Sequence, residues 1–188
     1  MFSSVKSVAL SGINGIITSV EADIRNGLPS FNMVGFLSTQ VRESGERVRA
    51  AVLNSGFYLE PKRILVNLSP ADIKKDVTSF DLAVAVAILA AQLSLDNDYL
   101  LETAFVGELS LSGELKSVTG VLPMVSAARE AGIRRFVLPV ANYREAKLVD
   151  GIEIIGVASL LEAVEAVQKR VEKGRTIDIE PAISEDKK

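Results

Sequence analysis

The chain has 188 residues and a net charge of −3, and its 48% hydrophobic and 24% charged content is typical of one globular domain. It contains neither cysteine nor histidine. These absences exclude thiolate chemistry, disulfides and cysteine-bound zinc, and they remove the commonest general base near neutral pH. The acidic balance argues against a domain that coats nucleic acid indiscriminately.

Nothing in the sequence predicts association with a membrane. The first residues, MFSSVKSVALSG, lack the charged and apolar regions of a secretory signal. The longest apolar run covers residues 82–91, whereas a membrane-spanning helix needs about 20 residues. We therefore expect a cytoplasmic protein.

Strands are predicted at residues 5–10, 16–24 and 30–34, separated by glycine-bearing turns, and their succession predicts an antiparallel meander. Residues 38–56 have the spacing of a helix that Ser38 or Thr39 caps and Gly56 ends. A strand at 64–68 and a strongly apolar helix at about 80–95 follow. We expect the second helix to be central, with three side chains fully enclosed: Val84, Ile88 and Leu89.

The second half repeats the alternation of strands and helices. A hairpin is predicted within residues 103–115, turning at Ser112 and Gly113, followed by a helix at 121–132. Strands at 134–139 and 152–157 precede a last helix, which Ser159 and Glu162 open as a capping box. The pattern predicts an α/β domain of two layers over residues 1–172. Residues 173–188 lose this periodicity, and we expect a linker or tail there.

Motifs for phosphate binding are absent from the sequence. No Gly-Lys dipeptide is present, so the chain cannot contain a G-x-x-x-x-G-K-[ST] loop, and its glycines do not form G-x-G-x-x-G. We therefore expect no bound cofactor. Three aspartates, Asp72, Asp76 and Asp81, suggest a Mg²⁺ site, but short polar side chains of this kind more often serve turns and caps.

Ser79 lies where the apolar helix is predicted to begin. Free N–H groups at that position suit either an activated serine or an ordinary N-cap, and the cap is the commoner role. A serine nucleophile needs an adjacent base or a lowered pKa. With no histidine in the chain, a lysine would have to supply the base.

Two segments resemble the proteolytic domain of Lon protease and its inactive relatives: KDVTS at 75–79 and the hairpin GELSLSG at 107–113. The resemblance implies the Lon-like fold, which is also that of domain 2 of a small-subunit ribosomal protein. It puts Ser79 at the nucleophile position and Leu122 at the position of the general-base lysine. Neither Lys75 nor Lys116 occupies that position. The resemblance therefore implies a vestigial site with no catalytic residues.

Longer motifs resemble the N-terminal domain of the ComM/YifB family of magnesium-chelatase-like AAA+ ATPases: VRESGERVRAA at 41–51, NSGF at 54–57, NLSPAD at 67–72 and SFDL at 79–82. Phe36-Leu37-Ser38 departs from the usual Leu-Pro pair. The resemblance implies a non-catalytic accessory domain whose partners are its own AAA+ domain and the neighbouring subunits of a hexamer. The resemblance implies that ATP and Mg²⁺ bind to the ATPase domain. It also implies that the full-length protein processes DNA, by branch migration or helicase action in natural transformation.

Two competing functions remain open. One is a divergent Lon-like serine peptidase that uses Ser79. The other is a module that contacts DNA or RNA through the basic segment between Ser38 and Arg63. The candidate residues of this module are Arg42, Arg47, Arg49, Lys62 and Arg63. They also fit a solvated helix face with internal ion pairs, Arg42–Glu46 and Glu43–Arg47.

Overall fold

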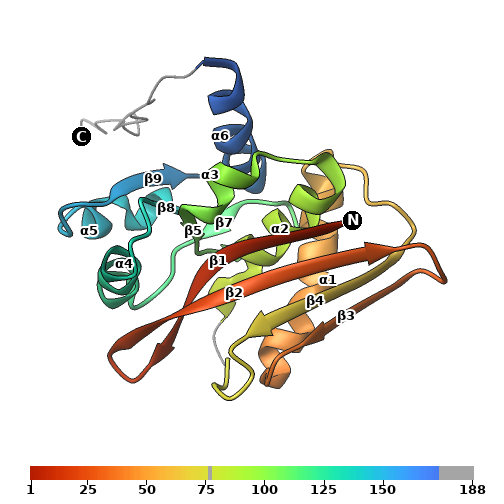
Figure 1. Cartoon of the computed structure of the whole chain (residues 1–188), viewed down its shortest axis with the longest axis horizontal. Helices are drawn as coiled ribbons and strands as arrows, with labels where there is room; N and C mark the ends of the chain where they lie inside the picture. Colours follow the sequence, from red (N-terminus) through yellow and green to blue (C-terminus); the bar gives the residue numbers. More distant parts are fainter. Residues whose placement is uncertain (76–77, 174–188) are drawn as a thin grey trace, which may run out of the picture.

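The computed structural model describes residues 1–75 and 78–173, which form one mixed sheet with helices packed on it (Figure 1). The strand order is β3-β4-β2-β1-β5-β8-β9. The strands are β1 (Phe2–Ser11), β2 (Asn14–Arg25), β3 (Ser30–Val34), β4 (Arg63–Ser69), β5 (Thr103–Phe105), β8 (Arg135–Pro139) and β9 (Glu153–Val157). Most neighbouring pairs are parallel, so the predicted α/β class is confirmed.

The predicted meander is wrong at its third strand. β1 and β2 form the expected antiparallel hairpin, but β3 pairs in parallel with β4, and β4 lies between β3 and β2. The helix α1 (Thr39–Asn54) connects β3 to β4. A parallel pair needs such a crossover, because a short turn can only join antiparallel neighbours. The strand-helix-strand succession at 30–69 was therefore the signal for this pairing.

Helix α2 (Asp81–Leu93) lies at the centre of the core and contacts β1 and β2. Val84, Ile88 and Leu89 are all 0% exposed, which confirms the prediction for this helix. Ser94 ends the helix in the left-handed conformation, with φ of 51°. Because α2 is apolar on every side, it can only be stable when other elements surround it.

The expected two layers describe only part of the molecule. Neighbouring side chains of β1 point to opposite faces of the sheet, and Val8 and Ala9 belong to different buried clusters. Ala9 lies in the cluster with α1, α2 and α6 (Leu160–Lys173), whereas Val8 lies in the cluster with α4 (Val121–Glu130). Helices therefore cover both faces near β1, β5 and β8, and the two-layer prediction is corrected there.

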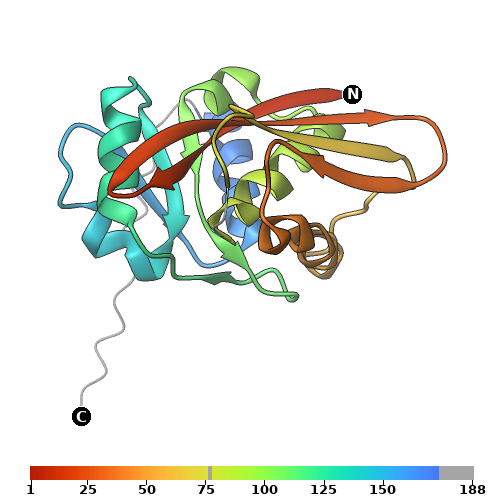
Figure 2. The ribbon, with the colours of Figure 1, turned by 90° about the horizontal axis from the view of Figure 1, so that it is seen from below.

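On β4 and the second half of β2 the face opposite α1 is largely open, whereas α4 packs against this face at Gly15 and Ile17 in the first half of β2. Alternate side chains of β4 are buried, Ile64 and Val66, or exposed, Arg63 and Leu65. Figure 2 shows α1 and α2 below these strands. On the face opposite α1 and α2, the described residues of β4 and of the second half of β2 form a sheet surface that faces solvent.

The second half contains the predicted hairpin as β6 (Glu108–Leu109) and β7 (Leu115–Lys116), with Gly113 in its turn at φ of 91°. The helices α4 and α6 and the strands β8 and β9 are also confirmed. The sequence prediction missed three short elements: α3 (Asn97–Leu101), α5 (Tyr143–Ala146) and β5, which pairs with β1 and β8 instead of extending the hairpin. Across 1–75 and 78–173, none of the helices combines the length and apolar character needed to cross a bilayer. Residues 174–188 of the predicted tail lie outside the described residues.

Candidate functional site

A buried lysine anchors the chain just before Ser79. Lys75 is 1% exposed, and its Nζ donates to the carbonyl oxygen of Gly35 at 2.8 Å and to that of Pro70. Its backbone joins the segment before α1 through Lys75 N–H to Phe36 O (3.1 Å) and Ser38 N–H to Lys75 O (2.9 Å). Burial lowers the pKa of the Lys75 amine, and Asp72 opposes this shift. Lys75 therefore works as a structural tie between two loops.

Ser79 does not cap the helix, so the predicted N-cap role is wrong. Residues Thr78–Phe80 form a 3₁₀ turn, η1, that runs directly into α2, and Phe80 is the N-cap residue without a side-chain cap bond. Ser79 is therefore already inside helical structure. Gly107 takes the capping role through its backbone: its carbonyl accepts from Leu82 N–H at 3.0 Å, and its N–H donates to Ser79 O at 2.9 Å. The Ser79 Oγ is buried and has no hydrogen-bond partner among the described residues.

Asp81 ties α1, α2 and β6 together. Arg47 Nε donates to Asp81 Oδ2 at 2.8 Å and its Nη2 donates to Oδ1 at 3.1 Å, while Leu109 N–H donates to Oδ2 at 3.0 Å. The Asp81 side chain is fully buried and the Arg47 side chain is 24% exposed. Burial raises the pKa of the Asp81 carboxyl above its ordinary value, and the bonds from Arg47 and Leu109 oppose that shift. The hydrogen bond to Asp81 raises the pKa of the Arg47 guanidinium.

Ser79 lies at a small polar pocket of about 240 Å³. Thr78 Oγ1 donates to Glu108 Oε2 across it at 2.8 Å. The other side chains around it contribute an amide, hydroxyls and two apolar groups; they are Gln40, Ser117, Val118, Thr119 and Met124. Among the described residues that line the pocket, none carries an amine, a guanidinium or an imidazole, and no hydrogen bond joins Ser79 to Glu108. Glu108 is the one ionisable group among these described lining residues.

Leu122 is not part of this pocket. Its side chain is 37% exposed at the start of α4, while Met124, two residues later and 1% exposed, lines the pocket. Lys116 lies opposite Glu108 in the β6–β7 ladder but does not line the pocket either. The residue at the position that the resemblance assigns to the general-base lysine therefore lies outside the lining of this pocket. The side chain that α4 does contribute to the pocket, Met124, is nevertheless apolar.

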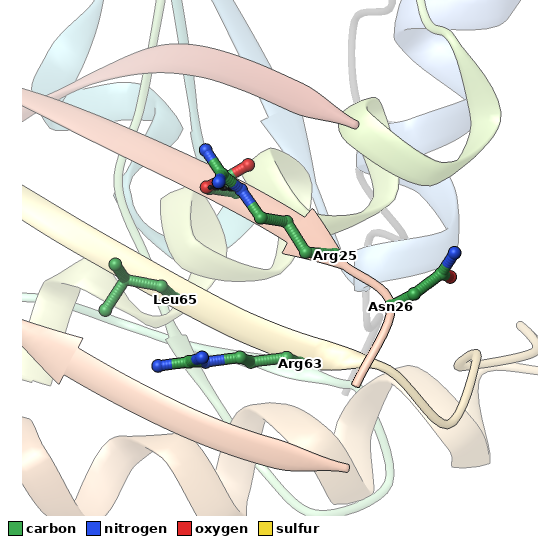
Figure 3. A pocket seen from close by; sticks show the side chains of 5 residues that line it. Arg25, Asn26, Arg63 and Leu65 are labelled. Carbon is green, nitrogen blue, oxygen red and sulfur yellow. Dashed lines mark hydrogen bonds and ion pairs between the residues drawn. The ribbon is translucent and has the colours of Figure 1, made fainter. Parts of the chain in front are cut away.

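The candidate basic residues do not form one surface. Arg42 and Arg49 are exposed on α1, but Arg47 is engaged by Asp81, and Lys62 Nζ pairs with Glu60 at 2.5 Å. The described ion pairs of α1 include neither Arg42–Glu46 nor Glu43–Arg47. Arg63 lies on the open face of β4, away from α1 (Figure 3).

The suggested Mg²⁺ site is not assembled. Asp81 is engaged by Arg47, and Asp76 lies outside the described residues. Within 1–75 and 78–173, no group of three or more acidic side chains is placed to hold a metal ion.

The family described as subunit ChlI of Mg-chelatase matches residues 20–142. The chain belongs to this family. The match begins within β2 and ends just after β8, and it includes the Arg47–Asp81 pair and the pocket at Ser79.

Several curated relatives extend this ChlI-family match. An uncharacterised Mycobacterium tuberculosis protein, Rv2897c, is 44% identical over 154 residues, 82% of this chain and 31% of its own length. Competence protein ComM of Haemophilus influenzae and YifB of Escherichia coli are each 38% identical over 86% of this chain. The chain spans only 31% of ComM and 32% of YifB. Lon protease 2 of Bacillus subtilis is more distant, at 29% identity over 150 residues.

The sequence did not show which side chains line the pocket of this ChlI-family domain. Thr78 and Glu108 lie within the two segments that resemble Lon protease, KDVTS and GELSLSG, but Gln40 lies in neither, and nothing in the sequence brings the three side chains together. Arg47 and Asp81 were considered in separate segments, so their pairing was missed. The one available signal was the aspartate directly before an apolar helix, because such a residue requires a cationic partner once the helix is buried.

Proposed function

We propose that this chain is the non-catalytic accessory domain, with a Lon-like fold, of a magnesium-chelatase-like AAA+ ATPase of the ComM and YifB type. The observation that carries the proposal is the extent of the match, 86% of this chain against 31% of ComM. A segment that aligns almost whole with one third of a relative is expected to serve the remaining two thirds. The ATPase and its action on DNA, branch migration or unwinding in a hexamer, would reside in that remainder. A cytoplasmic location is part of the proposal.

The pocket at Ser79 supports the non-catalytic part of the proposal. A serine hydroxyl is a weak nucleophile without a base, and the lining of the pocket offers neither lysine nor histidine. The relationship to Lon protease 2 then indicates descent from a common fold and not a shared reaction. Of the two rival functions, the serine peptidase is therefore the weaker.

The reading frame that encodes the chain tests this proposal. It should contain a G-x-x-x-x-G-K-[ST] motif after residue 188, and the whole protein should hydrolyse ATP in the presence of Mg²⁺. The 188-residue chain alone should cleave no peptide or protein substrate. A frame without such a motif, or peptide cleavage that Ser79→Ala abolishes, would overturn the proposal.

A further inference from the structure

Two arginines face each other directly on the open surface of the sheet. Arg25 of β2 and Arg63 of β4 are register partners in the antiparallel ladder. Opposed side chains in such a ladder have Cβ atoms about 5 Å apart, and like charges there destabilise the pair. Figure 3 shows both side chains extending along their strands, away from Asn26.

A pocket of about 350 Å³ lies at this pair, lined by Asp23, Arg25, Asn26, Arg63 and Leu65. Asp23 Oδ2 accepts from Arg25 Nε at 2.8 Å, which orients the guanidinium and leaves its two terminal nitrogens unbonded among the described residues. No described ion pair involves Arg63. The pocket therefore holds two cationic groups against one carboxylate, although the whole chain has a net charge of −3.

An adjoining pocket of about 440 Å³ continues the concave surface toward β1. It shares Asp23, Arg25 and Leu65 with the first pocket and adds Phe2, Glu21 and Asn67. Phe2 is 65% exposed and Leu65 is 41% exposed, so an aromatic ring and an aliphatic side chain lie beside the arginines. Phe2 and Leu65 flank Asp23 on either side in the ladder. Glu21 adds a second carboxylate, so the charged side chains that line the two pockets balance, Arg25 and Arg63 against Asp23 and Glu21.

We propose that this surface binds single-stranded nucleic acid, with a backbone phosphate between Arg25 and Arg63 and a base against Phe2. A phosphate accepts hydrogen bonds from both guanidinium groups and removes the repulsion between them. Exposed aromatic rings beside side chains that contact phosphate are the usual stacking platform for single strands. A small phosphate would use the arginines but not Phe2. The inference adds a site to the proposed accessory domain and rests on its role in a DNA-processing protein.

Fluorescence anisotropy with a labelled single-stranded oligonucleotide tests the proposal on the 188-residue chain. Arg63→Gln should weaken binding roughly three- to tenfold and flatten the plot of log affinity against log salt by about 0.7, the contribution of one phosphate contact on a single strand. Phe2→Ala should weaken binding by about fivefold without changing that slope. Arg49→Gln removes the same charge from an exposed position on α1 and should change neither quantity.

Equal losses in Arg63→Gln and Arg49→Gln would overturn the proposal, as would a wild-type chain that does not bind the oligonucleotide. Inorganic phosphate provides a second arm. If phosphate raises the melting temperature of the wild type but not of Arg63→Gln, while the oligonucleotide does not bind, the site takes small phosphates and the nucleic-acid proposal is wrong. ATP hydrolysis by the full-length protein is independent of these results, so failure of this site is distinguishable from failure of the proposed function.

Discussion

Arg47 of α1 and Asp81 of α2 are joined by two hydrogen bonds, of 2.8 and 3.1 Å, and the Asp81 side chain is fully shielded from solvent. The pair fixes the two helices relative to each other. Asp81 also accepts from Leu109 N–H, so the β6–β7 hairpin is held to the same point. Two of the elements that this pair connects, α1 and β6, also contribute side chains to the pocket at Ser79, Gln40 and Glu108.

Removing Arg47 should therefore destabilise the fold strongly. Arg47→Gln leaves the Asp81 carboxylate buried with only the Leu109 N–H, and we expect a loss of about 2–4 kcal/mol in the free energy of unfolding. Arg49→Gln, on the exposed side of the same helix, should change it by less than about 0.5 kcal/mol. Urea denaturation of both variants measures this, and equal stabilities would show that the pair is dispensable.

The same pair predicts a pH dependence. Burial raises the folded-state pKa of Asp81 above the unfolded value, so the folded state takes up a proton first as the pH falls, and this group's contribution makes stability rise toward acid. Loss of Arg47 removes a group that lowers this pKa, so the pKa rises further. The stability deficit of Arg47→Gln relative to wild type should therefore be smaller at pH 5 than at pH 8. A deficit that grows toward acid would contradict this account.

Ile88→Ala should cost about 2–5 kcal/mol in the free energy of unfolding, because the side chain is 0% exposed in the central helix and its removal leaves a cavity. Leu93, at the end of the same helix, is 41% exposed. Leu93→Ala should therefore cost clearly less. A loss below half a kcal/mol for Ile88→Ala would show that α2 is not core.

Ser79→Ala should leave stability unchanged or raise it slightly. Its Oγ is buried without a partner, and removing an unsatisfied hydroxyl relieves a desolvation cost. Ser38→Ala is the matched comparison, since Ser38 Oγ accepts from Val41 N–H at 3.3 Å as a true N-cap. That variant should lose about 0.5–2 kcal/mol. A comparable loss in Ser79→Ala would restore the capping role that the structure argues against.

MgATP should not stabilise the 188-residue chain. Without a Gly-Lys pair the chain has no loop to hold the β- and γ-phosphates. Its melting temperature should therefore not rise with MgATP beyond the effect of a salt control at the same ionic strength. Saturable binding at micromolar nucleotide in calorimetry would show that a nucleotide site exists outside the known motifs.

Local patterns in the sequence predicted most of the fold. α2 is apolar on all sides, and that pattern alone identified Ile88 as core. The pairing of β3 with β4 was missed because it joins strands across a whole helix, and short-range alternation carries no information about partners. β5 was missed because three residues are too few to show a period.

The candidate site was less predictable. Ser79 was found from its neighbours, but the helix start beside it is capped by the backbone of Gly107, which is 28 residues away from Ser79 in the sequence. Arg47 was expected on a solvated surface because Glu43, four residues earlier on the same helix, is placed to pair with it there. Its actual partner, Asp81, is 34 residues away. In the sequence, both Arg47 and Asp81 look like exposed charges. Packing decides which of them is buried, and only the structure reveals this.

The proposed domain supports an ATPase without being a catalyst itself. The decisive experiment measures ATP hydrolysis and strand branch migration by the full-length protein carrying Ser79→Ala, beside a variant that lacks the lysine of the phosphate-binding loop expected after residue 188. We predict that Ser79→Ala retains both activities at wild-type levels, while the loop variant loses both. Loss of activity in Ser79→Ala with its fold intact would contradict the account.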